Sequence, residues 1–178
     1  MQRVMVVGCG GAGKSTLAKR IAACTGLPII HLDTHFWSPG WVETPPEEWA
    51  KRVAALAARD RWVIDGNYSS SIDLRFARAD TVVFLDFPRW RCLARVVKRL
   101  WQYHGRTRSD MREGCPERLT MQFLRYVWHY RATRRARMLG WLNEFGRQGA
   151  THVLSSPRDV SAFVSELEAR FVSREDRC

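Results

Sequence analysis

The sequence lacks any long apolar run, and its five cysteines are scattered rather than paired. No stretch is long enough to cross a membrane as a helix, so we expect no membrane partner. The absence of Cys-x-x-Cys pairs argues against a disulfide framework or a structural zinc site. The first expected strand begins at residue 3, which leaves no room for a signal peptide. We therefore expect a cytoplasmic protein with reduced thiols.

Acidic residues are scarce between residues 89 and 137. This stretch holds 14 Lys and Arg but only Asp110, Glu113 and Glu117, whereas the two signs balance elsewhere, so it carries the whole net charge of +11. All but one of the 14 are Arg, whose forked guanidinium suits phosphate oxygens. The surplus predicts a polyphosphate ligand or nucleic acid as partner.

The length of 178 residues and the hydrophobic content of 46% predict one globular domain over residues 1–178.

A glycine-rich loop follows the first apolar run. Residues 4–7 predict a buried parallel strand, and Gly-x-x-x-x-Gly-Lys-Ser after them is the Walker A pattern. Its glycines let backbone N–H groups converge on phosphate oxygens, and the next helix points its positive end at the same anion. We expect Lys14 to reach the β- and γ-phosphates and the Ser15 hydroxyl to ligate Mg²⁺. The residues expected to bind ATP are Gly8, Gly10, Gly11, Ala12, Gly13, Lys14, Ser15 and Thr16.

Expected strands and helices alternate along the chain, which predicts an α/β fold with helices on both faces of a parallel sheet. A helix from about Thr44 is expected because Thr44-Pro45-Pro46-Glu47 looks like a capping box. The expected strands cover residues 3–7, 27–32, 62–64, 81–85 and 152–154. The expected helices cover residues 14–25, 44–59, 88–103, 117–145 and 157–171, with a loop over 34–43. On the helix over 88–103, the expected apolar stripe is Leu93, Val96, Val97 and Leu100.

Three aspartates each follow an expected strand, where ligands of such sheets bind. Asp65 is expected to be the second anchor for Mg²⁺, because a hard cation prefers carboxylate oxygen. Asp33 either hydrogen-bonds or deprotonates an acceptor hydroxyl, or it caps a helix or turn. Asp86 is expected to be a turn residue before Pro88.

Phosphoryl transfer requires positive charge around the γ-phosphate. Lys14, Arg95 and Arg99 are expected to supply it from the body of the domain. Arg131 and Arg135 lie one turn apart on the expected long helix and are predicted to reach in from there. Residues 104–118 are polar and contain two glycines, so we expect a mobile lid, which adds Arg106, Arg108, Arg112 and Arg118. A solvated basic surface is the alternative for each of these arginines.

Aromatic residues gather in the expected loops around an acceptor-side segment, residues 34–59. Phe36, Trp37, Trp41 and Tyr68 form either a wall for a ring-shaped ligand or the packing of a long loop. The five histidines have no metal-ligand spacing and are expected to be structural.

These motifs together resemble the adenylate kinase-like branch of the P-loop kinases and, more closely, the topology modulation protein family. The matching stretches are residues 8–16, 31–33, 36–41, 64–68, 84–90 and 114–118. The resemblance implies a three-layer sandwich with a five-stranded parallel sheet in the order 2-3-1-4-5, and phosphoryl transfer from ATP under a closing, Arg-rich lid. It also implies that Asp65 holds Mg²⁺ through water, that Arg95 packs on the adenine, and that Arg99 contacts phosphate. Ser156 falls in a loop that covers the adenine.

The chain departs from adenylate kinases on the acceptor side. Asn67-Tyr68 replaces the Phe-Pro-Arg that follows Asp-Gly in those enzymes, and their Gly-Asp-x-x-Arg is missing. Both departures argue against AMP as acceptor.

We therefore predict a Mg·ATP-dependent kinase for a small acceptor: a nucleoside, a nucleotide or another hydroxylated metabolite. The alternative is a nucleic-acid-binding protein with a regulatory or vestigial ATP site, which the Arg-rich stretch also supports. No helix-turn-helix pattern favours that alternative. A P-loop ATPase switch would need a water-positioning Gln that the sequence does not show.

Overall fold

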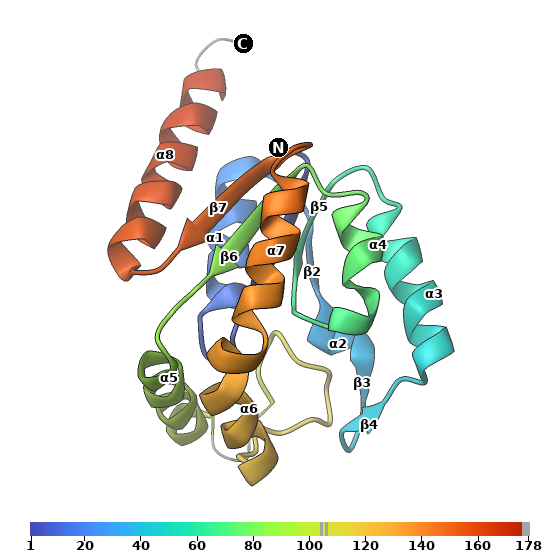
Figure 1. The fold of residues 1–178 in the computed structure, drawn as a ribbon. Coiled ribbons are helices and arrows are strands. Elements are labelled where there is room, and N and C mark those ends of the chain that lie inside the picture. The colour runs from blue at the N-terminus through green and yellow to red at the C-terminus, as the bar shows by residue number, and fades with distance from the viewer. Residues whose placement is uncertain (104, 106, 176–178) are drawn as a thin grey trace.

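The computed structural model describes residues 1–103, 105 and 107–175, which form three layers (Figure 1). The central layer is a sheet of five strands: β1 (Arg3–Gly8), β2 (Ile29–His31), β5 (Trp62–Asp65), β6 (Thr81–Leu85) and β7 (Ala150–Leu154). The strands lie in the order β2-β5-β1-β6-β7, and all neighbours are parallel. Numbered among themselves, they give the order 2-3-1-4-5, so the expected sheet is confirmed.

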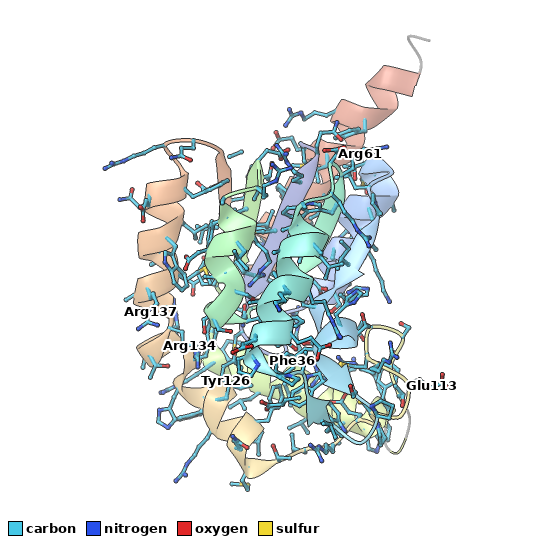
Figure 2. The ribbon with its side chains drawn as sticks, turned by 90° about the vertical axis from the view of Figure 1, so that its right-hand side faces the viewer. Phe36, Arg61, Glu113, Tyr126, Arg134 and Arg137 are labelled. Carbon is cyan, nitrogen blue, oxygen red and sulfur yellow. The ribbon has the colours of Figure 1, made fainter. Side chains whose placement is uncertain are left out.

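Helices cover both faces of the sheet. On one face α1 (Lys14–Thr25) packs against α8 (Pro157–Glu175). On the other, α4 (Ile72–Phe76) meets α7 (Arg135–Phe145) through the ring of Phe76, whose centroid lies 5.6 Å from that of Phe145. In Figure 2 the sheet lies between α1 and α7.

The core is built on the central strands. Residues 4–7 of β1 and all of β5 and β6 are buried. A strand covered by helices on both faces must be apolar at every position, which is why these runs show no alternation. The parallel strands end together, so the Walker loop, Asp65 at the last position of β5 and Asp86 after β6 lie at one edge.

The expected long helix over residues 117–145 is wrong, because two helices replace it. α6 (Met121–Thr133) begins where the Thr120 hydroxyl accepts a hydrogen bond from Phe123 N at 3.1 Å. It ends where the Thr133 hydroxyl donates to His129 O at 2.9 Å, a contact that bends helices. α7 then starts at Arg135 after a break at Arg134, whose φ is −121°.

The loop expected over residues 34–43 is also wrong. It contains the end of the short α2 (Leu32–Phe36) and a hairpin of β3 (Trp37–Ser38) and β4 (Val42–Glu43). Asp33 therefore lies in α2. The capping box at Thr44 does not form, because the Thr44 hydroxyl donates to Phe36 O at 2.6 Å and closes the hairpin. α3 (Pro46–Ala57) instead begins after Pro45 without a side-chain cap.

The buried face of α5 (Arg89–Gln102) differs from the expected apolar stripe. Cys92 and Val96 are fully buried, whereas Val97 is 53% exposed. The helix packs its Cys92 side onto the Walker loop, and this contact sets which face is covered. Among the described residues, no helix is both long and apolar enough to cross a membrane.

Candidate functional site

The loop between β1 and α1 is shaped for close approach by an anion. Gly11 has a φ of +78°, and a Cβ there would lie 2.4 Å from Cys92 O of α5. Gly13, with a φ of +98°, is the N-cap residue of α1. Only glycine takes both conformations readily, and the N–H groups at the start of α1 are left free to bind phosphate.

A cavity of about 590 Å³ opens in front of this loop, within the size range of small-molecule sites. Its lining includes residues 11–16 of the Walker loop and helix, one side of α5, part of the lid, and the start of α8. Among the described residues of this lining, seven are basic and only Asp110 is acidic; the basic ones are Lys14, Lys19, Arg20, Arg95, Lys98, Arg99 and Arg108. A cavity with this balance of charge favours a polyphosphate.

Two of the expected phosphate ligands contact the Walker loop directly. Lys14 Nζ donates to Cys9 O at 3.1 Å, and Arg95 Nη1 donates to Ala12 O at 2.8 Å. The Arg95 guanidinium also lies 5.0 Å from the ring centroid of Phe87. Both cations therefore stand at the rim of the loop, where phosphate oxygens would meet them.

Arg99 is joined to the lid through an ion-pair network. Its Nη2 lies 2.8 Å from Glu117 Oε1, and Arg108 Nη1 lies 3.2 Å from Glu117 Oε2. Burial and the charge of Arg108 lower the pKa of Arg99, and Glu117 opposes that shift. Glu117 thus forms ion pairs with two arginines that were predicted to lie near the phosphates. Of the other lid residues considered, His104 and Arg106 lie outside the described residues.

Arg131 and Arg135 lie elsewhere than predicted. Arg135 Nε is 2.7 Å from Asp86 Oδ2, and Arg131 Nε is 3.5 Å from Asp86 Oδ1. Neither lines the cavity. Asp86 is buried, so this pair of arginines neutralises its charge and fastens the junction of α6 and α7 to the end of β6.

Asp65, the expected metal anchor, is held by His31. The carboxylate lies at the end of β5 and is buried, with Oδ1 2.7 Å from His31 Nδ1. Burial opposes the charged imidazole, but the carboxylates of Asp65 and Asp110 raise the pKa of His31. Ser15 lines the cavity beside Lys14.

Asp33 forms a second polar cluster with Tyr68. Tyr68 Oη donates to Asp33 Oδ1 at 2.5 Å. Burial raises the pKa of both groups, while the hydrogen bond from Tyr68 opposes the shift at Asp33. The ring of Tyr68 packs on Phe36 and Trp49, with centroids 4.7 Å and 4.8 Å away. The aromatic residues therefore pack on one another beside Asp33.

Asn67 and Arg75 shape the acceptor side, and the sequence predicted no role for either of them. Asn67 Oδ1 accepts from Gly8 N at 3.0 Å, and its Nδ2 donates to Gly8 O at 2.7 Å and to Tyr126 Oη at 2.8 Å. Arg75 is fully buried and donates to main-chain carbonyls of residues 66–68. In the sequence Arg75 looks like any surface arginine of a short helix, and no local signal identifies either role.

Ser156 serves the start of α8. Its Oγ lies 2.8 Å from Asp159 Oδ1, and its N–H donates to Asp159 Oδ2 at 2.9 Å. The neighbouring Pro157, Val160 and Ser161 line the cavity, but Ser156 does not. The cavity is therefore bordered here by the first turns of α8 and not by Ser156.

All these groups lie at one end of the molecule. Figure 2 shows Phe36, Tyr126 and Glu113 toward the carboxyl ends of the strands and Arg61, which precedes β5, at the opposite end. This is where ligands of open parallel sheets bind.

No family model matches the sequence, and no curated protein matches it. Many solved structures share its fold, including a shikimate kinase and a gluconokinase. A shikimate kinase from Acinetobacter baumannii, in complex with shikimate, has a TM-score of 0.56 at 15% identity, covering 98% of this chain and 94% of that chain. A gluconokinase from Sinorhizobium meliloti 1021 has a TM-score of 0.51 at 19% identity, covering 97% of each chain. The likeness shows the α/β fold of these P-loop kinases.

Proposed function

We propose that the protein is a Mg·ATP-dependent kinase that transfers the γ-phosphate to a hydroxyl group of a small molecule. It would work as a single domain over residues 1–178, with its lid at 104–118 and its acceptor side at 34–59. The observation that carries the proposal is the Walker cavity, whose lining, in the part of the chain that the structure describes, has seven basic residues and one acidic residue. The fold, shared with small-molecule kinases, supports the same assignment.

On the side of the site that would bind ATP, four cations would contact the phosphates. Lys14 and Arg95 stand on the Walker loop, and Arg99 and Arg108 approach from α5 and the lid. Such a transfer needs positioned charge more than covalent help. Pro157 and Val160 offer an apolar wall for the base at the far end of the cavity.

On the acceptor side, Asp33 would take the proton of the acceptor hydroxyl. As the acceptor oxygen bonds to the γ-phosphorus and the bond to the β-phosphate breaks, the hydroxyl proton moves to the Asp33 carboxylate. Burial raises the pKa of Asp33, which makes its carboxylate a better base. Tyr68, donating to Asp33 at 2.5 Å, fixes the orientation of that carboxylate.

The donor set at this end of the sheet fits Mg²⁺. The Ser15 hydroxyl and the Asp65 carboxylate are the hard oxygen ligands that the ion prefers. His31 orients Asp65, as outer partners of metal ligands commonly do. When bound, the ion would offset charge on the phosphates.

The proposal is tested first at Lys14. Lys14→Ala should abolish Mg·ATP binding in calorimetry, because it removes the cation that belongs to the Walker loop itself. Lys51→Ala, at an exposed position on α3, is the matched control and should bind as wild type does. Normal Mg·ATP binding by Lys14→Ala would contradict the proposal.

Transfer is tested with radiolabelled ATP and a panel of nucleosides, nucleotides and hydroxylated metabolites. Shikimate and gluconate join the panel because the structural neighbours carry those names. Asp33→Asn should bind Mg·ATP yet lose transfer, whereas the exposed Asp73→Asn should retain it. Basal hydrolysis alone across the panel, together with DNA binding that survives both physiological salt and Lys14→Ala, would instead favour the nucleic-acid alternative.

A further inference from the structure

The lid lies along the first turns of α1. Lys19 Nζ donates to Ser109 Oγ at 3.0 Å. Burial opposes the charge of Asp110, but Arg108 and the nearby hydroxyl of Ser15 lower the pKa of its carboxyl. Ser15 and Lys19 are one helical turn apart, so residues 109 and 110 run beside the N-terminal end of α1. All four residues line the Walker cavity.

Asp110 is fixed in this position as a charged group. Arg108 Nε and Nη2 donate to its two oxygens at 3.0 Å and 3.2 Å. It is also the one carboxylate in the cavity lining as far as the structure describes the chain. A carboxylate in a phosphate site repels the nucleotide unless a cation lies between them.

We propose that Asp110 is a lid-borne ligand of the Mg²⁺ that accompanies the nucleotide, so that the ion fastens the lid to the Walker loop. The inference rests on the proposed function. Ser15, Asp65 and Asp110 would contribute one hydroxyl and two carboxylates from α1, β5 and the lid. Asp65 Oδ1 lies 2.7 Å from His31 Nδ1, and the charge of Asp110 also raises the pKa of that imidazole.

This role has a signature that a structural role lacks. With Mg²⁺, Asp110 attracts the complex, whereas without it the same charge repels the phosphates. Removing the charge should therefore change the two affinities in opposite directions. A residue that merely shapes the lid would change both in the same direction.

The experiment is calorimetric titration of a non-hydrolysable ATP analogue, with excess Mg²⁺ and with a chelator. Asp110→Asn should weaken binding of the Mg²⁺ complex by about 10-fold or more. It should tighten binding of the metal-free analogue several-fold. Asp110→Glu keeps the carboxylate. Its affinity for the analogue should depend on Mg²⁺ in the same direction as that of wild type. Glu113→Gln removes an equal charge from an exposed site at the outer edge of the lid and should change neither affinity (Figure 2).

Other results would overturn the inference. Parallel weakening of both forms by Asp110→Asn would show a structural role, and unchanged affinities would show no role. If wild type bound the analogue equally with and without Mg²⁺, the metal role would fail while nucleotide binding stood. If wild type bound no nucleotide at all, the proposed function would fail first and this inference with it.

Discussion

Arg75 is the residue on which the acceptor side depends most. It is fully buried, and among the described residues no carboxylate pairs with it. Its guanidinium donates to Gly66 O at 2.8 Å and to Tyr68 O at 3.1 Å, and it also contacts Asn67 O. These bonds fix a turn in which Tyr68 has a φ of +37°, a conformation that costs energy in a residue other than glycine. Burial lowers the pKa of Arg75 to about 9.

Replacing Arg75 with Ala should therefore destabilise the fold strongly. The change leaves several buried carbonyls without a donor, and we expect a loss of about 3 kcal/mol or more in the free energy of unfolding. Urea denaturation measures it. Arg78→Ala, at an exposed position on the next turn, should stay within about 0.5 kcal/mol of wild type. Equal stabilities for the two variants would contradict the anchoring role of Arg75.

At the scale of elements, the lid is joined to the acceptor-side hairpin. Gly40 N donates to Gly114 O at 2.9 Å, and Trp41 Nε1 donates to Pro116 O at 3.2 Å. Cys115 Sγ lies 3.2 Å from Ser38 O. The lid thus contacts the hairpin β3–β4 on one side and α1 and α5 on the other. Movement of the lid would change the donor and acceptor sides together.

Glu117 links α5 to the lid through two arginines that we propose as phosphate ligands. Its side chain is 6% exposed and contacts both Arg99 and Arg108. Glu117→Gln should tighten nucleotide binding several-fold in calorimetry, because the Arg99 guanidinium loses its carboxylate partner and can face phosphate, whereas Arg108 stays paired with Asp110. Glu113→Gln again serves as the lid control and should leave affinity unchanged. Weaker binding by Glu117→Gln would show that Glu117 positions the arginines rather than competing for them.

At the scale of the whole molecule, half-buried histidines make stability depend on pH in two directions. Burial lowers the pKa of His35 and of His152 from 6.5. Their contribution to stability is present above pH 6.5 and is lost as pH falls through the folded-state pKa. His31 has a raised pKa, so its contribution is present below pH 6.5 and is lost as pH rises.

His152 allows one of these contributions to be isolated. Its ring packs on Phe163 with centroids 4.8 Å apart and joins β7 to α8, and neither residue lines the cavity. His152→Phe keeps an aromatic contact and removes the titrating group. The melting temperature of the variant should rise relative to that of wild type as pH falls from 7 to 5. His129→Phe, at an exposed position, controls for loss of a histidine. A difference that stays constant across this range would contradict the sign derived for His152.

The sequence by itself determined the sheet, the Walker loop and the part of the chain that carries the excess positive charge. Each depends on neighbours along the chain: an apolar run, fixed glycine spacing, or a stretch almost free of acidic residues. It also placed Asp33 and Asp65 at the carboxyl end of the sheet, because parallel strands end together. Helix ends were less predictable. Thr44 and Thr133 both direct their hydroxyls to carbonyls outside the expected pattern.

Only the tertiary structure decided which polar and charged groups contact one another. Asn67 bonds to the backbone of Gly8, the lid brings Asp110 into the cavity that Ser15 also lines, and Arg131 and Arg135 turn to Asp86. Every one of these pairs is far apart in sequence, so no local pattern specifies it. The same holds for Arg75, because burial of a guanidinium among carbonyls depends on how a loop closes over it. Long-range packing therefore sets which of the many arginines face the cavity and which stabilise the fold.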